Sequence, residues 1–420
     1  MPLSVSAQTV TYHYRHYLFT LEASPAWQSA QDVWLYNGEP FDPPPTMLTD
    51  GDATAPLPAG VSKGEKPGWN RDAIASSIRS EIADVLAREP GSVVISRSGT
   101  GAITFAGVGL PGREVDVSET VAMTVMALEN GVSDVLLPVT ETQPKITVDP
   151  ALEKEGIKEV VTVGESDFSN SPVNRRQNIT VGLKKFNGTI IPQGSTFSFD
   201  KTLGRVDGTT GYAKELVIKG DQTVPDYGGG LCQVSTTAYR GIWEYGFPIV
   251  KRINHSYIVS HYSPQGTDAT VYPPGIDMQF QNDSPGSLLI QTFAEGTQAY
   301  FIYYGSRDDR KSEIFGPFLW GRTPPPPPRT EYSTDLQPGE KKKVGDAVPG
   351  EKAMWYRMLQ TGTGSEKMEP VYSSYEARPL YTLIGVAKMP AGGSGASLPT
   401  MFMEDQSGVT LPLQRYRGLP

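Results

Sequence analysis

The stretch Gly228-Gly229-Gly230-Leu231-Cys232-Gln233-Val234-Ser235-Thr236-Thr237 contains the single cysteine of this 420-residue chain. Three consecutive glycines let the backbone turn sharply and let another segment come close. The residues that follow, as far as Trp243, are compatible with a helix. A thiol at a helix N-terminus lies near exposed N–H groups and the positive end of the helix dipole, which both favour the thiolate. Cys232 is therefore predicted to be either a small buried residue or a nucleophile.

Two of the four histidines of the chain, His255 and His261, follow Cys232 closely, and Asp268 comes next. Cysteine-based acyl transfer needs a thiolate, a histidine that moves the proton and a group that orients the histidine. It also needs N–H donors for the oxyanion, which the backbone near Cys232 would provide. The order helix-cysteine, strand-histidine and strand-aspartate is similar to that of transglutaminase-like cysteine enzymes. Catalysis at Cys232 is thus one hypothesis.

The same residues leave other interpretations open. Cys232 can be a buried thiol that packs a tight turn, with His255 as a core histidine. A zinc site of Cys232, His255, His261 and Asp268 is a further alternative, but it lacks the closely spaced ligand pairs that are usual for zinc. We expect no metal and no cofactor.

The composition narrows the class of protein. The net charge of −9 argues against a nucleic-acid-binding protein and provides no basic patch for a membrane surface. No apolar run reaches the roughly 18 residues that cross a bilayer. Val5-Ser6-Ala7 resembles a signal-peptidase cleavage pattern, so we interpret the first residues as the end of a trimmed export signal.

The first part of the chain is predicted to hold an aromatic-rich segment (1–60) and an α+β domain (61–165). A strand is expected over Thr11–Leu21; His13 and His16 are spaced like metal ligands, but alternation within a strand is the simpler interpretation. Asn70 or Asp72 is predicted to cap a helix whose apolar face is Ile74, Ile78, Ile82 and Val85. A hairpin around 93–105 follows. Ser118 is predicted to cap a second helix with Val121, Val125 and Leu128 inside, and a strand is expected over Val135–Val139.

The second part is predicted to comprise a mixed domain (166–318), a polyproline linker (319–329), a β domain (330–388) and a tail (389–420). In the mixed domain we expect a helix over Asn178–Phe186, a helix after Cys232, and strands near Tyr257, Thr270, Met278, Leu289 and Tyr300. Pro324–Pro328 favours a semi-rigid polyproline spacer. The predicted fold class is therefore α+β and multidomain, with a helix-borne cysteine against a β-sheet.

The block 174–295 resembles the VanW domain family. The resemblance is carried by Asn178-Ile179 with Gly188 to Phe199, Gly211-Tyr212, the glycine–cysteine motif, Arg252, His255-Ser256, Gly266 to Thr270, and Asp277 to Asn282. The segment from Gly112 to Val139 is similar to the peptidoglycan-binding-like domain that often precedes VanW domains. The segment from Leu336 to Gly385 resembles a G5 domain, a β module associated with cell-wall sugars and adhesion.

The resemblance implies an exported bacterial cell-wall protein, since VanW domains are named for a glycopeptide (vancomycin) resistance cluster. It implies an L,D-transpeptidase that forms 3–3 peptidoglycan cross-links through a thioester on Cys232. His255 would then be the base and Asp268 its orienting group, with His261 as a second candidate histidine. Gly229, Gly230, Gln233 and Ser235 of the motif would bind substrate. Arg252 would pair with a stem-peptide carboxylate or form a structural ion pair.

The expected partners are peptidoglycan stem peptides and glycan, with no nucleic acid and no membrane span. Two other functions remain open at this point. One is a cysteine peptidase or amidase on peptidoglycan stems, and the other is a non-catalytic surface protein that binds the wall.

Overall fold

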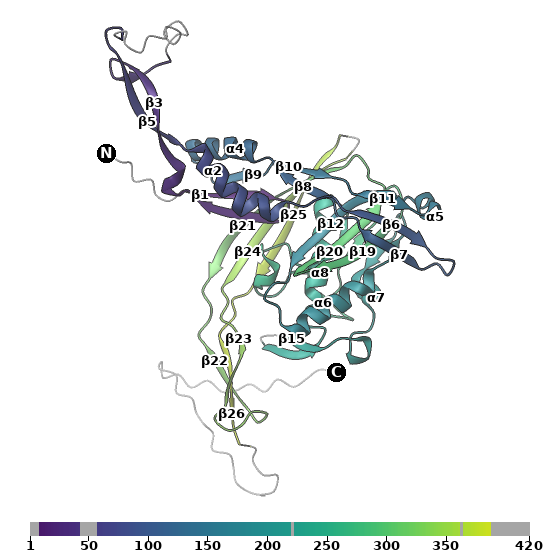
Figure 1. Cartoon of the computed structure of the whole chain (residues 1–420). Coiled ribbons are helices and arrows are strands. Elements are labelled where there is room, and N and C mark those ends of the chain that lie inside the picture. The colour runs from purple at the N-terminus through teal and green to yellow at the C-terminus, as the bar shows by residue number, and fades with distance from the viewer. Residues whose placement is uncertain (1–7, 43–56, 220–221, 362–363, 388–420) are drawn as a thin grey trace, which may run out of the picture.

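The computed structural model describes residues 8–42, 57–219, 222–361 and 364–387. The expected cleavage pattern at Val5-Ser6-Ala7 and the tail 389–420 lie outside these residues. The described chain is a mixture of helices and many strands, in agreement with an α+β class. In Figure 1 an N-terminal unit lies above a central body, and long C-terminal strands run along one side of that body. No helix in the described ranges is long and apolar enough to cross a membrane.

The N-terminal unit begins with a hairpin rather than the single expected strand. Strand β1 (Thr9–Tyr14) pairs with β2 (Tyr17–Glu22), and β9 (Asp134–Leu136) runs parallel to β1. The chain reverses at Arg15, whose φ of 51° is left-handed. His13 bonds to Asp134 at the surface, whereas His16 is buried against Glu244 of the central body.

The first long helix changes its register part-way. Helix α2 (Arg71–Ile78) begins after Asn70, whose side chain accepts from the Ala73 N–H, so Asn70 is the cap. A π-helical turn (Arg79–Ala83) and the short α3 (Asp84–Leu86) follow. The wider turn rotates the last residues, so Leu86 is buried and Val85 is 64% exposed. The prediction of Val85 on the apolar face was therefore wrong.

The second helix, α4 (Val117–Asn130), is capped by Asp116, which accepts from the Glu119 N–H, and not by Ser118. Its residues Val121, Val125 and Leu128 are buried, as predicted. The expected strand over Val135–Val139 divides into β9 and β10 (Val139–Thr142), because Pro138 lacks the N–H that a continuous ladder needs. Strand β10 pairs with β8 (Gly112–Val115).

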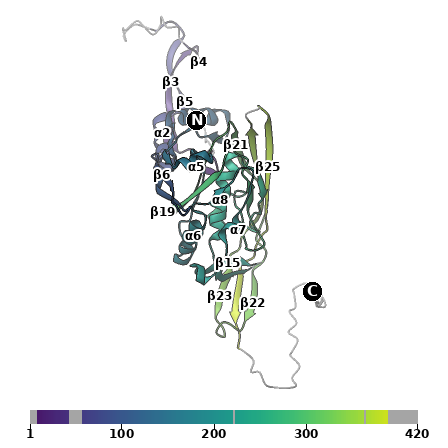
Figure 2. The ribbon, with the colours of Figure 1, turned by 90° about the vertical axis from the view of Figure 1, so that its right-hand side faces the viewer.

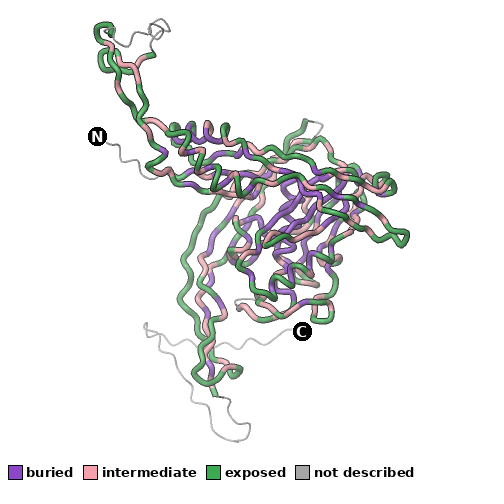
Figure 3. The backbone as a smooth tube through the Cα atoms, in the orientation of Figure 1, coloured by how far each residue is buried: buried purple, intermediate pink, exposed green. Residues whose placement is uncertain are grey.

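The remaining strands of this unit form two small sheets. The predicted hairpin is present as β6 (Ser92–Arg97) and β7 (Ile103–Val108), with β11 (Lys145–Val148) parallel to β6. A projecting sheet consists of β3 (Gln28–Tyr36), β4 (Glu39–Pro40) and β5 (Val61–Trp69). Figure 3 shows that this projection is mostly exposed, whereas the buried residues gather in the central body.

The central body is built on a four-stranded antiparallel sheet in the order β12-β20-β19-β13. Its strands are β12 (Glu159–Asp167), β13 (Ile190–Ile191), β19 (Leu288–Glu295) and β20 (Gln298–Gly305). The N-terminal hairpin β6–β7 packs on this sheet through Val93 and Ile95, which share a cluster with Ile302 and Tyr304. Short α5 (Pro150–Lys154) joins the two units.

Helices and small sheets complete the body. Helix α6 (Val173–Phe186) begins five residues before the predicted Asn178, and α8 (Leu231–Tyr245) follows the three glycines as predicted. The other elements are α7 (Phe199–Leu203), β14 (Thr196–Ser198), β15 (Lys214–Lys219), β16 (Gln222–Tyr227), β17 (Ile249–Lys251) and β18 (Gln279–Gln281).

Two strands predicted in this region do not form. The segment between β17 and β18, including Tyr257 and Thr270, is a long loop with one short 3-10 turn (Ser260–Tyr262). Pro264, Gly266 and Gly275 lie within it, and such residues interrupt strand ladders. His255 and Asp268 are therefore loop residues rather than strand residues.

Helix α8 is buried on nearly all sides. Gly241 faces Gly164 of β12, where an added Cβ would be 2.5 Å from the Gly164 nitrogen, so the pair lets helix and sheet approach closely. On its other side the ring of Trp243 meets Trp355 of the C-terminal sheet edge-on at 5.7 Å. Figure 2 shows α8 between these two layers.

The C-terminal strands form two sheets. One contains β21 (Lys311–Thr323), β24 (Gly350–Gln360) and β25 (Glu366–Tyr375), and the other contains β22 (Arg329–Ser333), β23 (Lys341–Gly345) and β26 (Tyr381–Gly385). The prolines 324–328 lie between β21 and β22. Strands β12 and β21 run without a break across the expected domain limits at 165/166 and 318/319.

Candidate functional site

The turn of three glycines places Cys232 in the first turn of α8. Gly228 and Gly230 have φ values of +81° and +115°, which side chains rarely adopt. A Cβ on Gly229 would lie 2.7 Å from a carbonyl oxygen of β15. The buried amide of Asn178 fixes the turn by donating to the Gly229 carbonyl oxygen at 3.0 Å. Cys232 is thus held, partly exposed, in a first turn where the N–H groups of Leu231 and Gln233 donate to the carbonyl oxygens of Gly228 and Gly230.

The loop after β17 brings His255 and Asp268 to this thiol. The Cys232 thiol and the His255 imidazole lie near enough for each to shift the pKa of the other. His255 Nδ1 lies 2.6 Å from Asp268 Oδ2, and the His255 backbone N–H donates to the same oxygen at 2.7 Å. The Cys232 Sγ is also 3.5 Å from the Val271 carbonyl oxygen. Three residues that are separated in sequence therefore meet at one place in the fold.

The electrostatics of Cys232, His255 and Asp268 favour a thiolate–imidazolium pair. Burial alone would raise the pKa of Cys232, but the hydrogen bond and positive charge of His255 bring that pKa below its ordinary value. Burial would lower the pKa of His255, yet bonds to Asp268 and Cys232 raise it to about 9. Burial alone would raise the pKa of Asp268. The hydrogen bond from His255 and the positive charge of Arg252 instead hold that pKa far below the usual range.

Asp268 is held by two further side chains. The Arg252 guanidinium forms an ion pair with Oδ1 at 3.1 Å and donates to the Asp268 carbonyl oxygen at 2.6 Å. The hydroxyl of Tyr375, on β25, donates to Oδ1 at 2.6 Å and accepts from the Gly266 N–H at 2.7 Å. Burial followed by the Asp268 charge raises the pKa of Tyr375, so the hydroxyl keeps its proton.

The strands β24 and β25 fasten the whole loop that carries His255 and Asp268. Arg252 donates to the Ser373 hydroxyl at 2.8 Å, and the Trp355 indole N–H donates to the Gln265 carbonyl oxygen at 2.7 Å. Further bonds at this seam join Asn254 to the carbonyl oxygen of Ser374 and the Glu376 N–H to that of Ser256. A C-terminal sheet therefore buttresses the candidate site.

The two candidate histidines have different surroundings. The His255 ring stacks on Tyr262 with centroids 4.5 Å apart. His261, one residue before Tyr262, is half-buried, and the charged groups that act on it are Arg175 and Asp167 rather than Cys232. Burial and Arg175 lower the pKa of His261. The structure thus brings His255, and not His261, to the thiol.

The other predicted substrate-binding residues serve the packing of the site. Gln233 is fully buried: its amide nitrogen donates to Ser166 at 2.8 Å, and its oxygen accepts from Arg175 at 3.0 Å. Ser235 is fully buried and its hydroxyl has no hydrogen-bond partner among the described residues. Arg252 forms an ion pair with Asp268 and a hydrogen bond to Ser373, as expected if it has a structural role.

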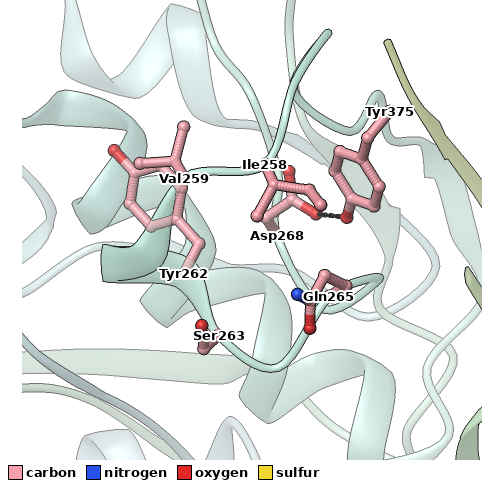
Figure 4. A pocket seen from close by; sticks show the side chains of 7 residues that line it. All are labelled: Ile258, Val259, Tyr262, Ser263, Gln265, Asp268 and Tyr375. Carbon is pink, nitrogen blue, oxygen red and sulfur yellow. Dashed lines mark hydrogen bonds between the residues drawn. The ribbon is translucent and has the colours of Figure 1, made fainter. Parts of the chain in front are cut away.

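A small cavity adjoins the carboxylate end of the site (Figure 4). It has a volume of about 10 Å³, about what one water molecule needs. Its lining residues are Ile258, Val259, Tyr262, Ser263, Gln265, Asp268 and Tyr375. A larger cavity of about 510 Å³ lies where the N-terminal unit meets β12 and β21, and it does not include Cys232, His255 or Asp268. In the described ranges no three His, Cys, Asp or Glu side chains are placed to hold a metal ion.

Comparison with known proteins places the site in a family. The model of VanW-like proteins matches residues 174–304. These residues form a VanW-like domain. The uncharacterized protein YoaR of Bacillus subtilis (strain 168) is 30% identical to the chain over 167 residues, which are 39% of this chain and 55% of that protein. The vancomycin B-type resistance protein VanW of Enterococcus faecalis (strain ATCC 700802 / V583) is 25% identical over 174 residues, 36% of this chain and 62% of that protein.

The matched region has clear limits. The chain spans between half and two thirds of the length of these two relatives. Cys232, His255 and Asp268 all lie within the VanW-like residues 174–304, whereas Tyr375 and Ser373 lie outside them. Sequence reasoning missed Tyr375, because it is 107 residues from its partner and carries no local motif. It also missed Arg175, whose only signal is its place three residues before Asn178 on the same helix.

Proposed function

We propose that this chain is a bacterial protein of the cell wall, located outside the cell, whose VanW-like domain is a cysteine acyltransferase of the L,D-transpeptidase kind. The observation that carries the proposal is the grouping of Cys232 with the hydrogen-bonded pair His255–Asp268, with the thiol in the first turn of α8. The name of the enterococcal relative, a vancomycin-resistance protein, supports a role at the wall.

The first half-reaction is acylation. The Cys232 thiolate attacks the carbonyl carbon of the third stem residue, and the backbone N–H of Cys232, at the start of α8, donates to the oxyanion. When the bond to the terminal D-alanine breaks, the His255 imidazolium gives its proton to the leaving nitrogen. The products are free D-alanine and a thioester on Cys232.

The second half-reaction is aminolysis of the thioester, which regenerates the free enzyme. The amine of a neighbouring stem attacks the thioester carbon and loses a proton to His255, now neutral. The carbon–sulfur bond breaks, which regenerates the thiolate and imidazolium and leaves a 3–3 cross-link. Asp268 keeps the imidazole in one orientation and stabilises its charged form throughout.

The experiment is incubation of the protein with tetrapeptide muropeptides and analysis of the products by mass spectrometry. Cross-linked dimers with release of D-alanine support the proposal. Shortened monomers without dimers would instead indicate a cysteine peptidase or amidase, and unchanged muropeptides a wall-binding protein without catalysis. A Cys232→Ala variant that keeps full activity would contradict both enzymatic functions.

In this proposal the C-terminal strands help to form the site and are not only a separate wall-binding module. Their bonds to Arg252, Asp268 and Gly266 support a role in positioning the reacting groups. A separate proposal is that the G5-like segment also binds glycan. Binding of purified peptidoglycan by the Cys232→Ala variant tests it.

A further inference from the structure

A buried guanidinium lies beside the candidate site without an acidic partner. Arg175 lies on the first turn of α6 and is only 8% exposed. Its guanidinium donates to the Ser171 hydroxyl at 2.6 Å and to Gln233 Oε1 at 3.0 Å, and its charge acts on the nearby hydroxyl of Tyr262. These three neighbours are neutral.

The charge of Arg175 is therefore not balanced by the protein. No carboxylate of the described residues lies within 4.0 Å of it, whereas the buried Arg113 meets Glu165 and the buried Arg252 side chain meets Asp268. Burying a cation without an opposite charge is costly, and a bound anion would supply the charge that its neutral neighbours do not. A guanidinium is also the group best suited to hold a carboxylate.

The position of Arg175 ties it to the reacting groups. Gln233, which it holds, is the residue after Cys232. Tyr262, on which the Arg175 charge acts, stacks on the His255 ring at 4.5 Å. A Cβ on Gly230 would lie 3.1 Å from Arg175 Cγ, so the arginine stem also packs on the turn before the thiol. Arg175 therefore lies beside the residues that flank Cys232 and His255.

We propose that Arg175 binds the terminal carboxylate of the acyl-donor peptide. This inference rests on the proposed function and specifies its substrate: a peptide whose scissile bond precedes a single C-terminal residue. Consecutive Cα atoms are ~3.8 Å apart, so the carboxylate of that residue lies within one residue of the carbon that Cys232 attacks. Arg252, the other candidate for this role, is already paired with Asp268.

The test compares two donor peptides that differ in charge. A stem tetrapeptide ending in D-alanine and the same peptide with a C-terminal amide are mixed with the protein, and acylation of Cys232 is followed by intact mass. The wild type should favour the free carboxylate by about 10- to 100-fold, the range of a charge-assisted bond. Arg175→Gln should abolish this preference, and Arg175→Lys should retain part of it.

The matched control is Arg176→Gln, an equal charge change at the adjacent and exposed residue. It should leave the preference intact. Because the preference is a ratio within one preparation, it does not depend on the fraction of folded protein. Equal acylation of both peptides by the wild type, or an equal loss of both in Arg175→Gln, would overturn the inference and leave the proposed function standing. Acylation of neither peptide by the wild type would overturn both.

A second readout needs no acyl transfer. Alkylation of Cys232 by iodoacetate, an anion, is compared with alkylation by the neutral iodoacetamide. The ratio of the two rates should fall in Arg175→Gln and stay unchanged in Arg176→Gln. An unchanged ratio in Arg175→Gln would contradict an anion-binding role for Arg175, whatever reaction the protein catalyses.

Discussion

The hydroxyl of Tyr375 donates a hydrogen bond of 2.6 Å to Oδ1 of Asp268, and so a C-terminal strand takes part in the candidate site. Asp268 Oδ2 meanwhile holds His255, so the two oxygens of one carboxylate join the C-terminal sheet to the imidazole. The contact gives the β24–β25 strands a function within the site.

Tyr375→Phe is expected to raise the pKa of His255. Removing the hydroxyl takes away a hydrogen bond that shares the charge of Asp268, so the carboxylate, which stays ionised, holds the imidazolium more strongly. The loss of a buried bond to a carboxylate should also cost about 1.5–3 kcal/mol of unfolding free energy. The measurements are the pH dependence of Cys232 alkylation and denaturant unfolding.

Tyr372→Phe is the control for this change. Tyr372 is on the same strand, but 49% exposed and stacked on Trp320 rather than bonded to the site. It should leave both measurements unchanged. If Tyr375→Phe lowers stability without any shift of the pH profile, Tyr375 has a structural role only.

The reactivity of Cys232 should begin at a lower pH than that of an ordinary thiol. The pKa of the thiol is below its ordinary value and that of His255 is about 9, so the thiolate–imidazolium pair is present between the pKa of Cys232 and that of His255. Acylation should thus rise as the thiolate forms and decline above about pH 9, where the proton for the leaving group is lost. Initial rates across the pH range check this, and a maximum only above pH 9 would be inconsistent with an ion pair.

Asp268→Asn should reverse both shifts. Without the carboxylate the imidazolium loses its main support, so the pKa of His255 falls and that of Cys232 rises. Thiolate absorbance in the ultraviolet, titrated against pH, should move to a higher midpoint than in the wild type. An identical midpoint would show that Asp268 does not act on the pair.

Gly230→Ala should damage both the fold and the site. The residue has a φ of +115°, and an added Cβ would meet Arg175 and Ile179 at 3.1 Å. We expect a loss of about 1–3 kcal/mol in unfolding free energy, together with slower alkylation of Cys232. Gly194→Ala separates the two causes, because Gly194 also has a positive φ but open space around it. Equal effects of the two changes would argue against crowding at the thiol.

Local patterns in the sequence predicted the elements that depend on neighbouring residues. The glycine–cysteine motif gave the start of α8, and apolar spacing gave the buried faces of α2 and α4. The same spacing failed at Val85, because a π-helical turn changes the period within the helix. The cap at Asp116 was missed because Ser118 is an equally good capping type two residues later.

The partners of the site were less accessible to prediction. The sequence order of Cys232, His255 and Asp268 predicted their meeting, although the latter two are on a loop held from outside and not on strands. That loop depends on contacts from β24 and β25 more than 100 residues away, for which no spacing rule exists. The neutral surroundings of Arg175 are likewise a property of packing, so only coordinates reveal them.

The proposed function requires that a stem peptide acylates Cys232 and releases its last residue. Its most direct test is intact-mass spectrometry of the protein mixed with a tetrapeptide stem ending in D-alanine, without an acceptor amine. We predict a mass increase equal to the tripeptide acyl group, located on Cys232 and absent from Cys232→Ala and His255→Ala. A wild-type protein that stays unmodified while its thiol alkylates readily would contradict the account.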